Sequence, residues 1–167
     1  SSYNPVTFDI TDALLPGEAE NVIAARVTTR SKGYEFDTND CWALSGIYRA
    51  VTLFAVPTTH LKDYTARTTL KPDGSAEVQF DVVASTAANV AGKLVSPAGK
   101  VAKEFQLALS GDGRGATSLV VSQPQLWTAE TPALYRMELD LQSGGKTVQR
   151  FTDQIGLRQV TIDQGVL

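Results

Sequence analysis

The sequence predicts an all-β protein, and three features of its 167 residues support this prediction. Apolar and polar residues alternate in many short segments, which places the apolar side chains of a strand on one face. Turn-forming glycine, proline, aspartate and serine residues separate these segments. Only the stretch from Asp12 to Leu15 favours a helical turn, and Pro16-Gly17 ends it.

The alternation is clearest from about Leu61 to Val160, where seven strands are expected. Val78, Phe80 and Val82 alternate with polar residues, as in an antiparallel strand with one solvated face. Seven short strands at this spacing are typical of an immunoglobulin-like β-sandwich. The predicted strands span residues 64–70, 76–84, 90–95, 101–109, 117–121, 135–141 and 147–155.

The links between these strands carry turn signals. Lys71-Pro72-Asp73-Gly74, Ser96-Pro97-Ala98-Gly99 and Ser143-Gly144-Gly145-Lys146 each predict a tight connection between two strands. The glycine-rich run from Ser110 to Gly115 is expected to form a mobile loop before the fifth strand.

The first 60 residues predict only three or four strands, among them Val22 to Thr28 and Ala50 to Val56. So small a sheet would leave open edges and half a core, which is unstable alone. We therefore expect these residues to belong to a larger β-domain whose earlier strands are absent. The opening Ser1-Ser2, without an initiator methionine, agrees with a piece of a longer parent chain.

Composition excludes several classes of function. The net charge of -3 and the absence of a basic cluster argue against nucleic acid as a partner. No apolar run approaches the roughly 20 residues of a membrane-spanning helix. Cys41 is the only cysteine and His60 the only histidine, so neither a disulfide nor a thiolate metal cluster can form within the chain. The compartment stays open among periplasmic, extracellular and cytoplasmic.

Four stretches, taken together and in order, resemble glycoside hydrolase family 2, and within it the β-galactosidases. The richest is Asp37 to Arg49, which reads DTNDCWALSGIYR. The run from Phe8 to Ala24 resembles the segment that precedes this loop in the family. Pro124 to Tyr135 resembles the pattern P-x-L-W-[ST]-x-E-x-P-x-L-Y, and Ile155 to Arg158 resembles the G-[FI]-R strand before the catalytic barrel.

The resemblance implies three domains in the parent: a jelly-roll sugar-binding domain, an immunoglobulin-like domain and a (β/α)8 barrel with both catalytic groups. Residues 1–60 would be the C-terminal strands of the jelly-roll (galactose-binding-like) domain, residues 61–160 the sandwich, and residues 161–167 the lead-in to the barrel. We expect no catalytic residue in this chain. A retaining glycosidase needs two carboxyls about 5–5.5 Å apart, and Asp37 and Asp40 on one loop lack a preformed cleft.

Asp40 is the main candidate for a role at the sugar. In the β-galactosidases that the chain resembles, the corresponding aspartate contacts sugar hydroxyls and helps to hold a sodium ion, tasks that suit a carboxylate. The alternative is an aspartate that caps a turn. Trp42 could stack on a sugar ring, although packing at a core or domain junction is the favoured interpretation. No cofactor is expected in this chain, whereas sodium and magnesium are implied for the parent.

Other singled-out residues have structural interpretations. Gly46 is expected to allow a backbone geometry that a side chain would block. Trp127 is expected to plug the core of the sandwich or its end. His60 is expected to pack at the domain junction, and Cys41 to be a small buried apolar group.

The sequence therefore predicts a non-catalytic fragment of a parent that hydrolyses terminal β-galactosides with retention. Its expected partners are the parent's own catalytic barrel and a β-galactoside, in a possible homo-oligomer. Three alternatives stay open: a parent with β-glucuronidase or β-mannosidase specificity, a free-standing carbohydrate-binding module, and a structural sandwich from a surface-protein array. The last would need repeats, and no internal repeat is visible.

Overall fold

A computed structural model describes residues 5–15, 17, 19–28, 46–47 and 49–161 of the protein. Close backbone contacts divide the chain into two units, Ser1–Phe54 and Ala55–Leu167. The second unit contains all of the strands among the described residues, and each unit is described by itself.

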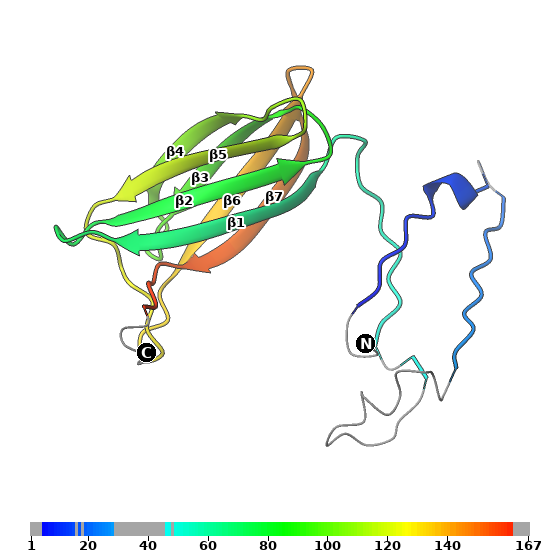
Figure 1. Cartoon of the computed structure of the whole chain (residues 1–167), viewed down its shortest axis with the longest axis horizontal. Coiled ribbons are helices and arrows are strands. Elements are labelled where there is room, and N and C mark those ends of the chain that lie inside the picture. The colour runs from blue at the N-terminus through cyan, green and yellow to red at the C-terminus, as the bar shows by residue number, and fades with distance from the viewer. Residues whose placement is uncertain (1–4, 16, 18, 29–45, 48, 162–167) are drawn as a thin grey trace. The chain divides into compact units, whose positions relative to one another are not determined.

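The second unit is a β-sandwich of two antiparallel sheets (Figure 1). The smaller sheet has the strand order β1-β2-β5 and the larger one the order β4-β3-β6-β7. All seven predicted strands are present, which confirms the immunoglobulin-like expectation. The strands are β1 (Leu61–Leu70), β2 (Ala76–Ala84), β3 (Asn89–Val95), β4 (Val101–Ala108), β5 (Arg114–Val121), β6 (Leu134–Ser143) and β7 (Lys146–Gly156).

The chain enters and leaves the sandwich at opposite ends, because it crosses the sandwich seven times. Residues 57–60 lead into β1 at one end of the sandwich, here called the linker end, whereas β7 finishes at the opposite end, the exit end (Figure 1). The loop 122–133 between β5 and β6 also lies at the exit end. The sandwich therefore carries the chain from one end to the other.

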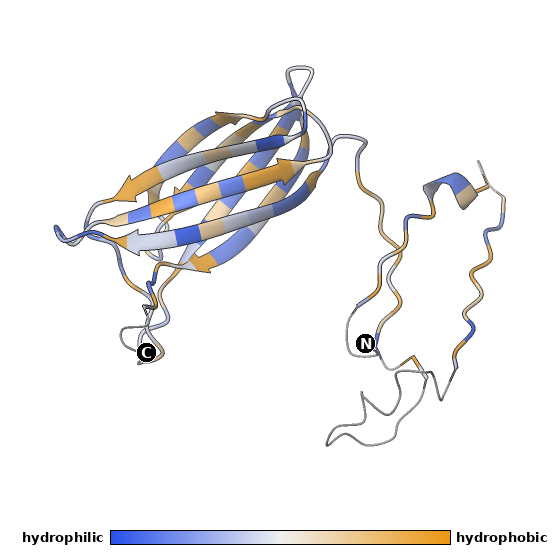
Figure 2. Cartoon of the chain, in the orientation of Figure 1, coloured by the Kyte–Doolittle hydropathy of each residue, from blue (hydrophilic) through white to orange (hydrophobic). Residues whose placement is uncertain are grey.

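The core explains why these segments became strands. Alternate residues of β2 and β6 are buried, so hydrophobic and hydrophilic residues alternate along the ribbons (Figure 2). Phe80 of β2 and Phe105 of β4 stack with ring centroids 5.5 Å apart, which joins the two sheets. The largest side chains that are almost completely buried belong to Phe80, Leu94, Met137, Leu157, Val78, Val82 and Val90.

Side chains close the sandwich where the edge strands β1 and β7 approach each other. The Tyr64 and Phe151 rings lie 5.3 Å apart, and the Tyr64 hydroxyl donates to the Asp153 carboxylate. Burial, together with that acceptor, raises the pKa of Tyr64 above its usual range. The Leu61 backbone N–H donates to Gln149 Oε1 at 2.7 Å. This edge of β1 is thus partly paired by side chains, which protects it from pairing with another strand.

A buried tyrosine fixes the start of β6. Tyr135 is 2% exposed, and its hydroxyl oxygen accepts a hydrogen bond from the Gln125 backbone N–H at 3.0 Å. The contact is similar to the tyrosine corner of immunoglobulin-like domains, although its partner lies ten residues upstream. It ties the loop 122–133 to the end of the core.

The predicted loop from Ser110 to Gly115 is shorter than expected. Arg114 and Gly115 are already the first residues of β5, and they pair with Val83 and Val82 of β2. The turn before them is closed by the Gly113 N–H, which donates to the Ser110 carbonyl at 2.8 Å. Gly113 has a φ of +78° and a Cβ there would meet the Ala84 carbonyl oxygen at 2.4 Å, so the turn needs glycine.

The described part of the first unit contains one short 3-10 turn, η1 (Thr11–Ala13), close to the predicted helical turn. The strands predicted over 22–28 and 50–56 are not strands in the structure. A strand needs a ladder of hydrogen bonds to a neighbour, and these described residues form no ladder. None of them is buried, and Phe8, Val22, Val51 and Leu53 expose 69–83% of their surface. No helix among the described residues is long and apolar enough to cross a membrane.

Candidate functional site

The loop that carries Asp37, Asp40, Cys41 and Trp42 lies outside the described residues, so the sugar-binding and sodium roles of Asp40 and the weaker sugar role of Trp42 stay predictions. At its C-terminal side the structure describes Gly46, whose φ is +111°. Only glycine adopts this backbone conformation without strain, which confirms the expectation for Gly46.

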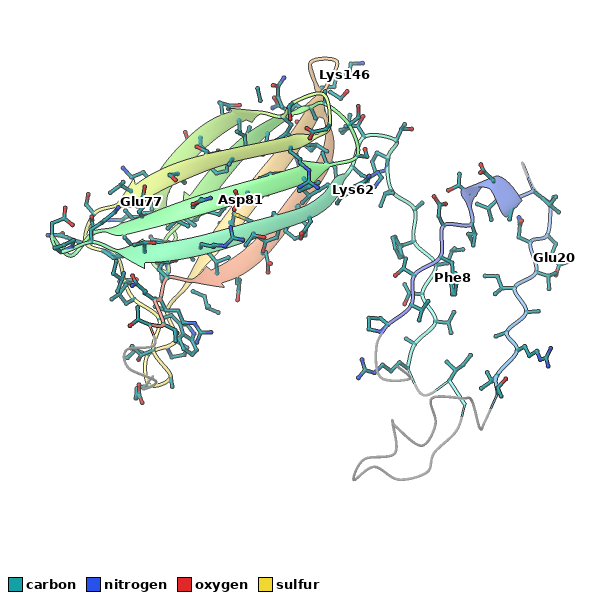
Figure 3. The ribbon with its side chains drawn as sticks, viewed as in Figure 1. Phe8, Glu20, Lys62, Glu77, Asp81 and Lys146 are labelled. Atoms are coloured by element: carbon teal, nitrogen blue, oxygen red, sulfur yellow. The ribbon has the colours of Figure 1, made fainter. Side chains whose placement is uncertain are left out.

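Most of the described carboxylates of the sandwich form ion pairs on its outer faces or accept hydrogen bonds in its turns. Glu77 and Asp81 lie along the outer face of β2, where they pair with Lys71 and Arg67 (Figure 3). On the larger sheet Glu104, Glu138 and Asp140 pair with a lysine or an arginine. These exposed pairs contribute little free energy individually and give the two faces a mixed charge.

Two turn aspartates have a lowered pKa because they accept local hydrogen bonds. Ser75 donates to Asp73 Oδ1 from its hydroxyl at 2.7 Å and from its backbone N–H at 2.9 Å, and this lowers the Asp73 pKa. Asp112 is held in the same way by Ser110 and Arg114. A general acid at a sugar would need a raised pKa, so these two groups serve the turns that they close.

The sandwich has a small apolar cavity between its sheets near β1 and β7, lined by Leu61, Val90, Leu139, Leu141, Gln149 and Phe151. Its one polar lining side chain, Gln149, already accepts the Leu61 N–H. The cavity has a volume of about 10 Å³, which is about the space of one water molecule, so a sugar ring does not fit in it. Among the described residues no group of three or more histidine, cysteine, aspartate or glutamate side chains could hold a metal ion.

A hydrogen-bonded cluster fixes the chain at the linker end. Ser85, just after β2, donates from its hydroxyl to the Thr58 carbonyl at 2.8 Å and accepts the His60 N–H at 3.1 Å. The Ser85 N–H donates to the His60 carbonyl at 2.8 Å. The His60 Nδ1–H donates to the Pro57 carbonyl at 2.9 Å. His60 therefore holds the approach to β1, and its packing between two domains stays a prediction.

The exit end is organised around Trp127. Its indole is half-buried against Gly156, where an added Cβ would come within 2.8 Å of the indole ring. The Trp127 N–H donates to the Leu157 carbonyl at 3.0 Å. The Arg158 guanidinium carbon lies 4.7 Å from the centroid of the indole ring. Trp127 thus closes the end of the sandwich, as predicted, and it also holds the segment that follows β7.

Comparison with known proteins identifies the family of this arrangement. The sequence profile of the glycosyl hydrolases family 2 matches residues 59–158, from just before His60 to Arg158. The chain belongs to glycosyl hydrolase family 2. The part matched contains all seven strands of the sandwich.

Curated β-galactosidases align with almost the whole chain. A β-galactosidase of Leuconostoc mesenteroides subsp. mesenteroides is 35% identical over 98% of this chain. A β-galactosidase of Alteromonas mediterranea is 31% identical, also over 98% of it. The chain spans about a sixth of the length of these relatives, since the alignments cover 17% of each.

Solved structures of a β-glucuronidase share the sandwich fold. The β-glucuronidase from Ruminococcus gnavus in complex with uronic deoxynojirimycin is 25% identical, with a TM-score of 0.56 over 65% of this chain and 17% of that one. Its complex with D-glucaro-d-lactam gives the same identity and TM-score, over 65% of this chain and 18% of that one.

Sequence reasoning missed the contacts that hold the two ends. Ser85 carries no motif, and a single serine after a strand gives no signal of the linker that it binds. Arg158 was noted within the run Ile155 to Arg158, but nothing in that run indicates that its guanidinium stacks on Trp127. The sequence gives only an indirect sign of this contact, because Trp127 and Arg158 lie in two separate family-like motifs.

Proposed function

We propose that the chain is a non-catalytic part of a retaining β-galactosidase, which hydrolyses terminal β-galactosides with two carboxyl groups in a barrel domain outside this chain. The observation that carries the proposal is the alignment of 98% of the chain with β-galactosidases six times its length. The described carboxylates with a resolved pKa shift, Asp9, Asp73 and Asp112, all have a lowered pKa, whereas a general acid needs a raised one.

The sandwich acts in this proposal as a rigid spacer between the sugar-binding domain and the barrel. Its linker and exit ends are opposite each other, and each is held by several hydrogen bonds or ring contacts. A spacer of this kind fixes the distance between two domains, which helps to keep an active site shared by them in a productive geometry.

Residues 1–60 belong in this proposal to the sugar-binding domain and contribute the loop with Asp40 to the active site. The exposed Phe8, Val22, Val51 and Leu53 support the first part, since such side chains are normally covered in a complete domain. Asp40 would accept hydrogen bonds from sugar hydroxyls, whereas Trp42 would pack in a core or at a domain junction rather than stack on the sugar. Asp40 would be nearly idle without the opposing wall of the barrel.

The similarity to β-glucuronidase structures makes a β-glucuronide the main alternative to a β-galactoside as substrate. A panel of substrates tests the proposal. The full-length parent is expected to hydrolyse a chromogenic β-galactoside with a kcat/KM at least about tenfold above that for the matching β-glucuronide or β-mannoside. Preference for the glucuronide would overturn the galactosidase assignment. Galactose binding by the 167-residue chain alone, measured by calorimetry at millimolar sugar, would instead favour a carbohydrate-binding module.

Replacing Asp40 with asparagine in the full-length parent tests its role. A hydrogen bond to a charged group contributes about 1.5–3 kcal/mol, so kcat/KM for the galactoside should fall about 10- to 100-fold. Asp81→Asn is the matched control, because Asp81 lies on the outer face of the sandwich and pairs with Arg67. Steady-state kinetics in which both variants behave like the parent would remove Asp40 from the site.

A further inference from the structure

Two aspartates of the sandwich are followed directly by glycine, in the pairs Asp73-Gly74 and Asp112-Gly113. The first pair lies in the turn between β1 and β2, which extends beyond the sheet at the exit end (Figure 1), and the second lies in the turn between β4 and β5. Because glycine has no Cβ, its backbone nitrogen can approach the carboxyl group of the preceding aspartate closely. An Asp-Gly pair is therefore open to attack of the backbone on the side chain.

This attack converts aspartate into isoaspartate and needs only water. The glycine nitrogen bonds to the aspartate Cγ and loses its proton, while a carboxyl oxygen leaves as water and a five-membered succinimide ring closes. Water then adds to the main-chain carbonyl carbon of the ring and breaks the bond of that carbon to the nitrogen, so the chain continues through Cγ. The first step requires the nitrogen and Cγ in contact and a protonated carboxyl group, because a charged carboxylate resists a nucleophile.

The fold opposes the reaction at both turns in the same way. The glycine N–H donates to a carbonyl three residues earlier, from Gly74 to Lys71 at 3.0 Å and from Gly113 to Ser110 at 2.8 Å. Each aspartate also accepts a serine hydroxyl and a backbone N–H of its own turn, and these bonds favour the charged carboxylate. Each turn must therefore open before its carboxyl group can react.

The two turns differ in how the glycine is held. Gly74 is exposed, and the described hydrogen bonds of its turn stay within residues 71–75. Gly113 is buried, since a Cβ there would lie 2.4 Å from the Ala84 carbonyl oxygen and 3.2 Å from that of Thr86. The Gly113 carbonyl also accepts the Ala84 N–H at 2.8 Å. The second turn must leave the end of β2 in order to open, so its opening costs more free energy than that of the first.

We propose that Asp73 is a site of spontaneous isomerisation to isoaspartate in the folded chain, whereas the fold protects Asp112. Opening of the β1–β2 turn, which releases the Asp73 carboxylate from Ser75, limits the reaction. The exposed Gly74 and the buried Gly113 carry the proposal, since the two reacting pairs have the same sequence. Isoaspartate adds one carbon to the main chain, so the modified turn no longer matches the Lys71 N–H to the Ser75 carbonyl, now 2.9 Å apart.

Prolonged incubation of the 167-residue chain at neutral pH, followed by peptide mapping, measures both sites. Isoaspartate keeps the peptide mass but changes its elution and blocks an aspartate-specific protease. In the folded chain Asp73 is expected to isomerise at least about tenfold faster than Asp112. In concentrated urea the two rates should agree within about twofold, because no turn remains to protect either pair. Equal rates in the folded chain, a faster Asp112, or no isoaspartate at Asp73 where the unfolded chain forms it would each overturn the proposal.

Replacing Ser75 with alanine tests the role of turn opening. The variant loses the hydroxyl that donates to Asp73 Oδ1 at 2.7 Å, so the Asp73 rate should rise about two- to tenfold and the Asp112 rate should stay the same. Asp73→Ala is the control for the peptide map, and the turn with Ala98-Gly99, closed by the Gly99 N–H at 2.8 Å from the Ser96 carbonyl, has this pair already. An unchanged Asp73 rate in Ser75→Ala, at an unchanged melting temperature, would refute control of the reaction by this turn.

Discussion

Replacing Phe80 with alanine is expected to destabilise the sandwich by about 3–5 kcal/mol, which raises its unfolding equilibrium constant at least about a hundredfold. Phe80 is 1% exposed and its ring stacks on that of Phe105 in the opposite sheet. Alanine would leave a cavity between two sheets whose strands are held by hydrogen-bonded ladders, so the walls cannot collapse fully into the space.

Chemical denaturation of the chain measures this effect. The midpoint of the sandwich transition in urea should decrease in Phe80→Ala while the m-value stays the same, because the surface exposed on unfolding hardly changes. Phe54→Ala is the matched control, since it removes the same side chain from a position that is 64% exposed in the first unit. Its sandwich transition should be unaltered. A loss below about 1 kcal/mol in Phe80→Ala would show that the two rings do not join the sheets.

The strands of the sandwich were predictable because the pattern that produces them is local. Val78, Phe80 and Val82 alternate with polar residues, and β2 has the predicted bounds, Ala76–Ala84. The start of β5 was placed three residues late. Arg114 and Gly115 join the ladder through their pairing with Val83 and Val82, and a glycine-rich sequence gives no sign of such a partner.

The residues that precede the sandwich show the limit of the same pattern. Residues 22–28 and 50–56 alternate as strands do, yet they form no ladder among the described residues. Alternation states which face a strand would bury, whereas the strand itself exists only beside a neighbour. The prediction failed because the partner strand is not specified by the segment.

Contacts that join distant residues were not predictable either. The Leu61 N–H bonds to Gln149, which is 88 residues away, and the Leu70 N–H bonds to Gln159 at a separation of 89 residues. Glutamine is a common surface residue, so only the fold reveals that these two close an open strand edge. The family-like motif around Asp40 was visible in the sequence, but it lies outside the described residues, so its role stays a prediction.

Replacing Gly92 with valine is expected to destabilise the sandwich by about 3 kcal/mol and to lower its melting temperature by about 10 °C or more. Gly92 of β3 faces Phe105 of β4 directly in the ladder. A Cβ at Gly92 would lie 2.1 Å from Phe105 Cζ, which means that the ring occupies the place of the missing side chain. Valine must therefore expel the ring, and the stack with Phe80 is lost with it.

Thermal unfolding of Gly92→Val, followed by circular dichroism, measures the loss, and Gly111→Val is the control. A Cβ at Gly111 meets no heavy atom within 4 Å, and the φ of Gly111 is not in the left-handed region. This variant should therefore have nearly the same melting temperature as the unsubstituted chain. Because the damage in Gly92→Val comes from one ring, a smaller residue opposite should recover part of it. The double variant Gly92→Val with Phe105→Leu is expected to be more stable than the sum of its single effects by at least about 1 kcal/mol. If the loss of stability in the double variant equals the sum of the two single losses, the ring of Phe105 is not the reason that this position requires glycine.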